Sequence, residues 1–312
     1  MKPALLQIKP MMPHVEAALN EAYSVHRLWE AGDAGSLLAE IGSGVRGVAT
    51  DGHAGLPASV MAALPGLEII ASYGVGYDAI DVPACTARGV HVTNTPDVLN
   101  DAVAEMAIGL MISLCRRIPQ ADRFVREGAW LAKDYPLTGE LTGARAGILG
   151  LGRIGKEIAR RLEVFKMEIA YHGRQEQSGQ PYQYFTDLTD MANHVDWLVV
   201  IGPGSPETAG IVSRGVLEGL GPDGHLVNIA RGSLVDEPAM VELLRSGKLG
   251  GAALDVFADE PNVPGELMDL DNVVLSPHQG SATARTRTAM GDLVVRNLAA
   301  HFAGEPLISP VA

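Results

Sequence analysis

The chain has 312 residues, which at about 150 residues per domain corresponds to roughly two domains. Its 24 Lys and Arg against 37 Asp and Glu give a formal net charge of −13, which disfavours a nucleic acid or an anionic membrane surface as partner. With 47% hydrophobic and 20% charged residues, the composition is that of a globular protein and not of a disordered one.

Several features of the chain point to a cytoplasmic protein. Residues 1–8 lack the apolar stretch of a secretory signal and predict a strand instead. Cys85 and Cys115 are too few for a disulfide framework, and we expect them as buried thiols in a reducing compartment. The longest apolar segment, 102–115, is shorter than the roughly 20 residues that span a bilayer.

In the first hundred residues, short apolar runs alternate with helical patterns. This alternation is typical of βαβ units and predicts a parallel sheet. Pro13 and Pro57 lie where a proline is compatible with the first turn of a helix, and another helix is expected to begin near Gly35. We expect strands over residues 4–8, 47–50, 67–71 and 90–93.

Residues 98–117 then form a helical pattern that is apolar almost all round. After residue 143 the alternation of apolar runs and helical patterns resumes. Six strands with helices between them match a complete dinucleotide-binding sheet. These strands are expected over residues 146–149, 168–171, 197–201, 225–229, 252–254 and 273–275.

Residues 146–155, AGILGLGRIG, place a G-x-G-x-x-G motif between a predicted strand and a helix over 156–165. Gly150 permits the tight turn, Gly152 lets the backbone approach a pyrophosphate, and Gly155 allows the helix to pack against the strand. The alternative is a glycine turn without a ligand, but the flanking strand and helix favour a dinucleotide. The expected contacts include the intervening Leu151, Arg153 and Ile154.

The end of the next strand distinguishes the two nicotinamide cofactors. An NAD enzyme usually has Asp or Glu there to bind the ribose hydroxyls, whereas this chain has His172-Gly173-Arg174, followed by Gln175. A missing carboxylate removes repulsion towards a 2′-phosphate, and an arginine can grip that phosphate with two hydrogen bonds. NADPH is therefore favoured over NADH, although a merely solvated Arg174 is the alternative.

Three further segments follow strands of the second sheet, at the edge where an open α/β fold binds ligands. Arg231 follows the strand 225–229, Glu260 comes after 252–254, and His278 comes after 273–275. Each residue alone is more often structural than catalytic, but the combination is much more specific. The histidines and cysteines show no metal-ligand spacing, so we expect no metal site.

The last long helical pattern covers residues 283–302, with Met290, Leu293 and Leu298 at helical spacing. Because the second sheet lies between this helix and the helix over 98–117, we expect the two helices to connect two domains. The tail from residue 306 then returns to the first domain. The expected domains are a discontinuous substrate domain, 1–98 and 285–312, and an inserted NADP-binding domain, 99–284.

With Arg231, Glu260 and His278 in this order and these contexts, the chain resembles the D-isomer-specific 2-hydroxyacid dehydrogenases over nearly its whole length. Residues 74–81, 94–96 and 100–105 match as well. Residues 103–110, 150–155 and Arg174 look most like the glyoxylate, hydroxypyruvate and hydroxyphenylpyruvate reductase branch. The resemblance implies two doubly wound parallel-sheet domains, a Rossmann domain inserted into a discontinuous flavodoxin-like domain.

The resemblance also implies roles for these residues. His278 acts as general acid and base, Glu260 orients it, and Arg231 binds the substrate carboxylate and polarises the carbonyl. The backbone N–H groups of Val75 and Gly76 hold the carboxylate as well, in a turn for which the alternative is a turn without a ligand.

By the same resemblance, further residues contact the cofactor: Val103, Pro203, Thr208, Ile229, Ala230, Asp255 and Gly280, together with Arg231 and His278. One departure is Pro203-Gly204-Ser205, where the family commonly has Pro-Leu-Thr. Trp130 resembles an arm residue that reaches the neighbouring subunit in some relatives, with local packing as the alternative.

We therefore expect a homodimeric, NADPH-dependent reductase of small 2-oxo acids, glyoxylate and hydroxypyruvate first. The nearest alternatives are NAD-dependent dehydrogenases of the phosphoglycerate, D-lactate or hydroxyphenylpyruvate type. The missing acid after Tyr171 argues against an NAD enzyme. A non-enzymatic dinucleotide-sensing corepressor is the alternative from another class, and retention of all three catalytic residues argues against it.

Overall fold

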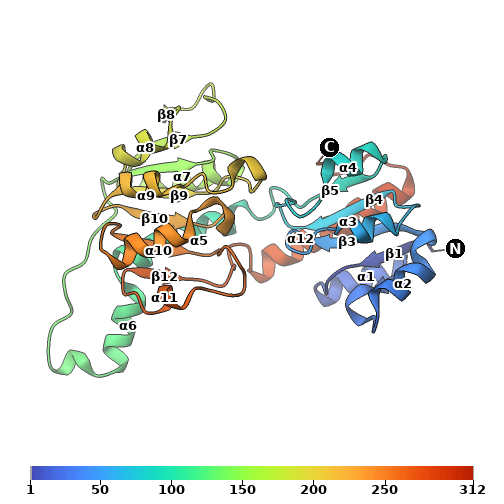
Figure 1. Ribbon diagram of the computed structural model, residues 1–312, viewed down its shortest axis with the longest axis horizontal. Coiled ribbons are helices and arrows are strands. Elements are labelled where there is room, and N and C mark those ends of the chain that lie inside the picture. The colour runs from blue at the N-terminus through green and yellow to red at the C-terminus, as the bar shows by residue number, and fades with distance from the viewer. Residues whose placement is uncertain (1, 312) are drawn as a thin grey trace. The chain divides into compact units, whose positions relative to one another are not determined.

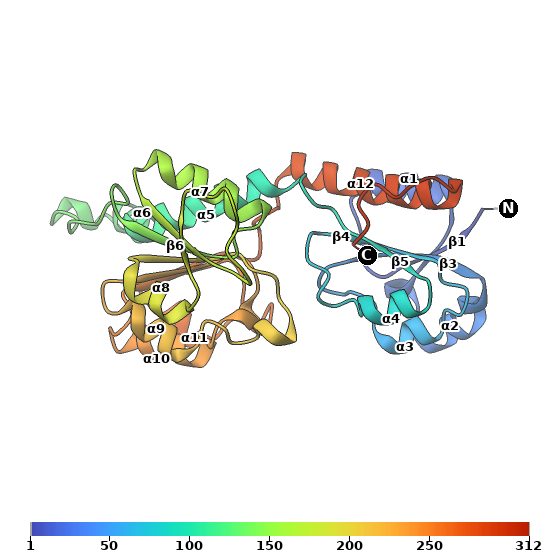
Figure 2. The same cartoon turned by 90° about the horizontal axis from the view of Figure 1, so that it is seen from above.

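The computed structural model describes residues 2–311 (Figure 1). The chain divides into two compact units, Met1–Leu99 with Thr283–Ala312, and Asn100–Ala282. Each unit contains one parallel sheet with helices on both faces, in agreement with the α/β class expected from the sequence (Figure 2). Among the described residues, no helix combines the length and the apolar character needed to cross a bilayer.

The first unit contains a five-stranded parallel sheet in the order β2-β1-β3-β4-β5, which is the flavodoxin-like order. The strand β2 was not expected, because its residues are exposed or half-buried at the sheet edge and form no apolar run. The strands are β1 (Ala4–Gln7), β2 (Ser24–Arg27), β3 (Val45–Asp51), β4 (Ile69–Tyr73) and β5 (His91–Thr93).

Helices cover both faces of this sheet, as Figure 2 shows. One face packs against α1 (Pro13–Ala22) and α12 (Ala284–Ala303), which bury Val15, Leu19 and Leu298 in one apolar cluster with the sheet. The other face is covered by α2 (Ala34–Ile41), α3 (Ala58–Ala62) and α4 (Val82–Ala87).

The C-terminal tail returns to the first unit, as expected. Val311 N donates to Val92 O at 2.8 Å, and Ser309 Oγ donates to Asn94 O at 2.7 Å. These bonds place the tail beside β5 and close the discontinuous unit.

The second unit contains a seven-stranded parallel sheet in the order β12-β11-β10-β9-β6-β7-β8. The order reverses direction at β6, as in dinucleotide-binding folds. Six of these strands were expected; β8 is an additional three-residue edge strand. The bounds are β6 (Arg145–Leu149), β7 (Glu168–His172), β8 (Gln183–Phe185), β9 (Trp197–Val200), β10 (His225–Asn228), β11 (Gly251–Leu254) and β12 (Val273–Leu275).

On one face of this sheet lie α5 (Asn100–Cys115) and α7 (Arg153–Val164), and on the other lie α8 (Leu188–His194), α9 (Arg214–Leu220) and α10 (Glu237–Arg245) (Figure 2). The helix expected over 98–117 is shorter, because Arg117 adopts a left-handed backbone with φ 50°. The chain then starts a separate helix, α6 (Ile118–Arg126). The short helix α11 (Gly265–Met268) precedes β12.

Candidate active site

The three residues expected to perform catalysis follow three neighbouring strands. Arg231 follows β10, Glu260 comes after β11, and His278 comes after β12. These strands pair with one another in parallel, so their carboxyl ends share one edge of the sheet. The fold thus gathers segments that are far apart in the sequence.

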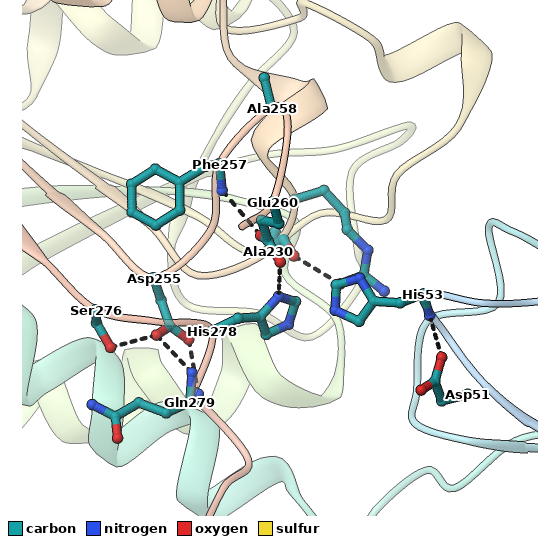
Figure 3. A network of polar contacts seen from close by, with 12 residues as sticks. Asp51, His53, Ala230, Asp255, Phe257, Ala258, Glu260, Ser276, His278 and Gln279 are labelled. Carbon is teal, nitrogen blue, oxygen red and sulfur yellow. Dashed lines mark hydrogen bonds and ion pairs between the residues drawn. The ribbon is translucent and has the colours of Figure 1, made fainter. Parts of the chain in front are cut away.

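At this edge, Glu260 and His278 form a hydrogen-bonded pair (Figure 3). His278 Nδ1 lies 2.8 Å from Glu260 Oε2, and the two side chains are 29% and 21% exposed. The other carboxylate oxygen, Oε1, accepts a hydrogen bond from Phe257 N at 3.0 Å. Because an ionised carboxylate only accepts, this contact assigns a proton to Nδ1 of His278.

The backbone of His278 has φ 49°, a conformation that a non-glycine residue adopts only with support from its surroundings. Asp255, only 1% exposed, gives that support. Its Oδ1 accepts from Ser276 Oγ at 2.6 Å and from Gln279 N at 2.9 Å, while its Oδ2 accepts from Gly280 N at 2.8 Å (Figure 3). One buried carboxylate therefore binds the chain on both sides of His278.

Arg231 lies on a turn that Asn228 stabilises. The side chain of Asn228, 1% exposed, donates to Arg231 O at 2.9 Å and accepts from Ala230 N at 3.1 Å. The Arg231 guanidinium donates to Ala230 O at 2.8 Å. A Cβ on Gly232 would lie 1.9 Å from the carbonyl carbon of Phe257, so the segments after β10 and β11 approach each other too closely for any side chain there.

Sequence reasoning did not single out the supporting residues Asn228, Gly232 and Ser276. Their signal is position alone: each lies within three residues of Arg231 or His278 along the chain. A single sequence does not distinguish a buried serine that donates to a carboxylate from an exposed serine. Only the packed structure identifies it.

The glycine turn fits a dinucleotide pyrophosphate. Gly150 has φ 101° and donates its N–H to His172 O at 3.0 Å, and a Cβ on Gly155 would lie 2.2 Å from Gly150 O. Gly152, by contrast, has no atom within 4 Å of its would-be Cβ, so a ligand has access there. Gly152 is also the N-cap of α7, where no side chain caps the first turn, and the N–H groups of that turn suit an anion. Leu151, Arg153 and Ile154 lie in the same turn.

The segment expected to select NADPH lies next to this turn, because β7 pairs with β6. His172 ends β7, and its Nδ1 lies 3.0 Å from Phe185 O. Arg174 and Gln175 are exposed beyond it, and Gly173 O accepts a hydrogen bond from Tyr184 Oη at 3.1 Å.

Other residues expected at the cofactor form three groups. A Cβ on Gly280 would lie 3.1 Å from Asp255 Oδ2 and 3.7 Å from Val103, so these three residues meet between α5 and the His278 turn. Thr208 Oγ1 donates to Pro203 O at 2.9 Å, which closes the segment after β9 on itself. Ile229 and Ala230 are buried in the turn after β10.

Val75 and Gly76 lie in the first unit, in the turn after β4. Gly74 has φ 152°, a value that favours glycine, and its carbonyl accepts from Thr95 N at 2.8 Å. Asn94 Nδ2 donates to Val75 O at 2.8 Å. The bonds from Asn94 and Thr95 thus hold this turn through its carbonyl groups.

Residues 108–280 match the family model described as D-isomer specific 2-hydroxyacid dehydrogenase, NAD binding domain. The hydroxyphenylpyruvate reductase of Plectranthus scutellarioides is 46% identical over 307 residues, which cover 98% of each chain. The chain belongs to the D-isomer-specific 2-hydroxyacid dehydrogenases. The predicted family, fold class and enzyme class are thereby confirmed.

Other members of this dehydrogenase family are similarly close. A glyoxylate/hydroxypyruvate reductase of Arabidopsis thaliana is 45% identical over 98% of each chain. The structure of an NADPH-dependent glyoxylate/hydroxypyruvate reductase from Sinorhizobium meliloti, in complex with NADP and malonate, superimposes with a TM-score of 0.95 at 46% identity. That match covers 100% of this chain and 97% of the other. The reductase branch predicted from the sequence is confirmed.

Proposed function

We propose that this protein is an NADPH-dependent reductase that converts glyoxylate and hydroxypyruvate to the corresponding 2-hydroxy acids. The observation that supports this most directly is the Glu260–His278 pair, which shares one sheet edge with Arg231. The absence of an acidic residue at the end of β7, where His172 is followed by Gly173 and Arg174, supports NADPH over NADH. The relatives named for these reductions support the choice of substrates.

In the proposed mechanism, bound NADPH supplies the hydride to the carbonyl carbon of the 2-oxo acid. His278 Nε2 gives its proton to the oxygen as negative charge develops there, which completes the hydroxyl group. Glu260 accepts a hydrogen bond from Nδ1–H throughout, so the imidazole keeps its orientation while Nε2 gives up its proton. In the oxidation direction, the neutral imidazole takes the hydroxyl proton.

Positively polarised groups hold the substrate in this proposal. Arg231 binds the substrate carboxylate and polarises the carbonyl, since its planar guanidinium presents several N–H donors in one plane. The N–H groups of Val75 and Gly76, in the first unit, bind the carboxylate too. We assign substrate binding to the unit formed by Met1–Leu99 with Thr283–Ala312, and NADP binding to Asn100–Ala282.

The proposed partner in assembly is a second copy of this chain. Large apolar side chains are exposed on α6 and the segment after it: Leu131 is 96% exposed, Leu137 100% and Trp130 64%. In both Figure 1 and Figure 2, α6 extends away from the sheet of its own unit. Exposed apolar side chains gathered in one projecting segment are typical of an interface.

A cytoplasmic location belongs to the same proposal. Cys85 and Cys115 are both free thiols, which suits a reducing compartment. The net charge of −13 favours small-molecule ligands over nucleic acid or an anionic membrane surface.

The proposed function is tested by following oxidation of NADPH and NADH with glyoxylate, hydroxypyruvate, pyruvate and phenylpyruvate. We expect NADPH with glyoxylate or hydroxypyruvate to give the highest kcat/KM. His278→Ala is expected to lower kcat by about 100-fold to 10,000-fold, because it removes the proton donor. Glu260→Gln is expected to lower kcat by roughly tenfold or more, because an uncharged amide oxygen is a weaker acceptor for the Nδ1–H bond that orients the imidazole.

Three results would contradict the proposal. Unchanged turnover in both variants would refute the roles of His278 and Glu260. A preference for NADH would refute the cofactor assignment. Tight NADPH binding by the wild-type protein without turnover of any 2-oxo acid would instead favour a dinucleotide sensor.

A further inference from the structure

The segment that carries Arg174, residues 173–182 between β7 and β8, is bonded to the glycine turn through Gln177. The Gln177 side chain donates from Nε2 to Leu151 O at 2.8 Å. The backbone N–H of Gln177 donates to Tyr171 Oη, also at 2.8 Å. A single residue thus links the segment both to the turn after β6 and to strand β7.

The tyrosine that receives this bond is itself rigidly placed. Tyr171 is only 1% exposed, and its ring packs on that of Tyr184 with 5.2 Å between centroids. Tyr184 Oη in turn donates to Gly173 O at 3.1 Å, directly before Arg174. The segment is therefore held to the sheet on both sides of Arg174 by buried or half-buried groups.

We propose that Gln177 is a specificity-determining positioning residue that holds Arg174 in place for the 2′-phosphate of NADPH. This inference rests on the role of Arg174 given under the proposed function. Arg174 is exposed, so a flexible segment would lose conformational freedom on gripping a phosphate. The two hydrogen bonds of Gln177 and the hydrogen bond to Gly173 already order the segment when the protein folds. The segment therefore loses less conformational entropy when Arg174 binds the phosphate, and the cofactor binds more tightly.

The same residue also orients part of the pyrophosphate site. Leu151 O belongs to the planar peptide whose N–H is that of Gly152. When Gln177 binds this carbonyl group, it restricts rotation of the peptide and thus the direction of the Gly152 N–H. We therefore expect loss of Gln177 to weaken the binding of both cofactors slightly, and the binding of NADPH more than that of NADH.

Gln177→Glu is the sharpest test, because the side chain keeps its size while the amide donor to Leu151 O is replaced by a carboxylate that repels it. We expect the ratio of kcat/KM for NADPH to that for NADH to fall by about fivefold, the effect of one net hydrogen bond. The kcat with saturating NADPH is expected to stay within about twofold of wild type, because the catalytic pair is untouched. Tyr171→Phe retains the ring packing but removes the acceptor, and it should shift the ratio in the same direction.

Two measurements on the cofactor-free protein make the test independent of turnover. Calorimetry compares binding of adenosine 2′,5′-bisphosphate with that of adenosine 5′-monophosphate; Gln177→Glu should reduce the preference for the bisphosphate. Amide hydrogen exchange of residues 173–182 should become faster in the same variant. Gln183→Ala, at an exposed position on β8, is the matched control and should change neither measurement.

Arg174→Ala, measured in parallel, distinguishes the role of Arg174 in binding the 2′-phosphate from the role of Gln177 in positioning Arg174. The inference is supported if Arg174→Ala abolishes the preference for the bisphosphate and both Gln177→Glu and Tyr171→Phe weaken it. It is overturned if Arg174→Ala abolishes the preference while Gln177→Glu keeps the wild-type value. A wild-type preference in Arg174→Ala refutes the role of Arg174 itself, and with it the cofactor part of the proposed function.

Discussion

Asp255 lies beneath the turn that presents His278, and its carboxylate accepts hydrogen bonds from Ser276 and from two backbone N–H groups. These bonds hold a residue with positive φ, a conformation that is unfavourable without support. The geometry of the Glu260–His278 pair therefore depends on a second carboxylate. A single substitution that removes one hydrogen bond to Asp255 tests whether the geometry of the pair depends on it.

We expect Ser276→Ala to lower kcat by about tenfold, because small displacements of a catalytic group are costly. It should also lower the free energy of unfolding by about 1–3 kcal/mol, since a buried carboxylate loses a donor. Steady-state kinetics and denaturant unfolding measure the two effects. Ser246→Ala, which removes the hydroxyl of an exposed serine just after α10, is the control. Loss of stability without loss of kcat would show that Ser276 does not position His278.

At the scale of elements, the strands with buried apolar runs were predicted correctly, including the edge strands β5 and β12, whereas the edge strands β2 and β8 were not. The strands β2 and β8 lie at sheet edges, where one side has no neighbour and the residues are largely exposed or half-buried. Such strands have no apolar run, so only pairing with β1 and β7 reveals them. The helix α6 was not predicted, although Pro119 lies in its first turn, where a proline is compatible with a helix start.

The amino ends of β9 and β10 contain a pH-sensitive contact. His225 pairs in register with Trp197, and the two rings stack with 4.3 Å between centroids. Burial lowers the pKa of His225 below its ordinary value of 6.5. The folded protein then binds fewer protons here than the unfolded chain, so the free energy of unfolding must fall as the pH drops below that value.

We therefore expect His225→Phe, which keeps an aromatic ring but cannot be protonated, to reduce the loss of stability between pH 7.5 and pH 5. Thermal unfolding measured at both pH values gives the comparison. An unchanged pH dependence in His225→Phe would contradict the prediction.

At the scale of the whole molecule, the proposed homodimer follows from exposed apolar side chains on the segment that begins with α6. A glutamate there would have to be buried without a partner, and the twofold symmetry of a dimer would introduce it twice. The double variant Leu131→Glu with Leu137→Glu is expected to be monomeric. Light scattering should then give once the chain mass of 32.9 kDa instead of twice.

Ile308→Glu serves as the control, since Ile308 is an exposed apolar residue in the C-terminal tail of the first unit. It should leave the mass of the assembly unchanged. If the double variant keeps twice the chain mass, the interface lies elsewhere.

The sequence by itself determined the features that depend on local chemistry and on order along the chain. The glycine turn, the missing acid after Tyr171 and the strand-end residues Arg231, Glu260 and His278 were all identified in this way. The turn and the strand ends follow from residue type and spacing, because a tight turn needs glycine. The catalytic roles of Arg231, Glu260 and His278 came from the resemblance to the family.

Only the tertiary structure decided which distant residues meet. Strand order places β10, β11 and β12 side by side, and packing directs Asp255 to the backbone around His278 and Gln177 to Leu151. These contacts join residues separated by tens of positions. No local pattern records them, because they depend on how buried polar groups find partners once the sheet has formed.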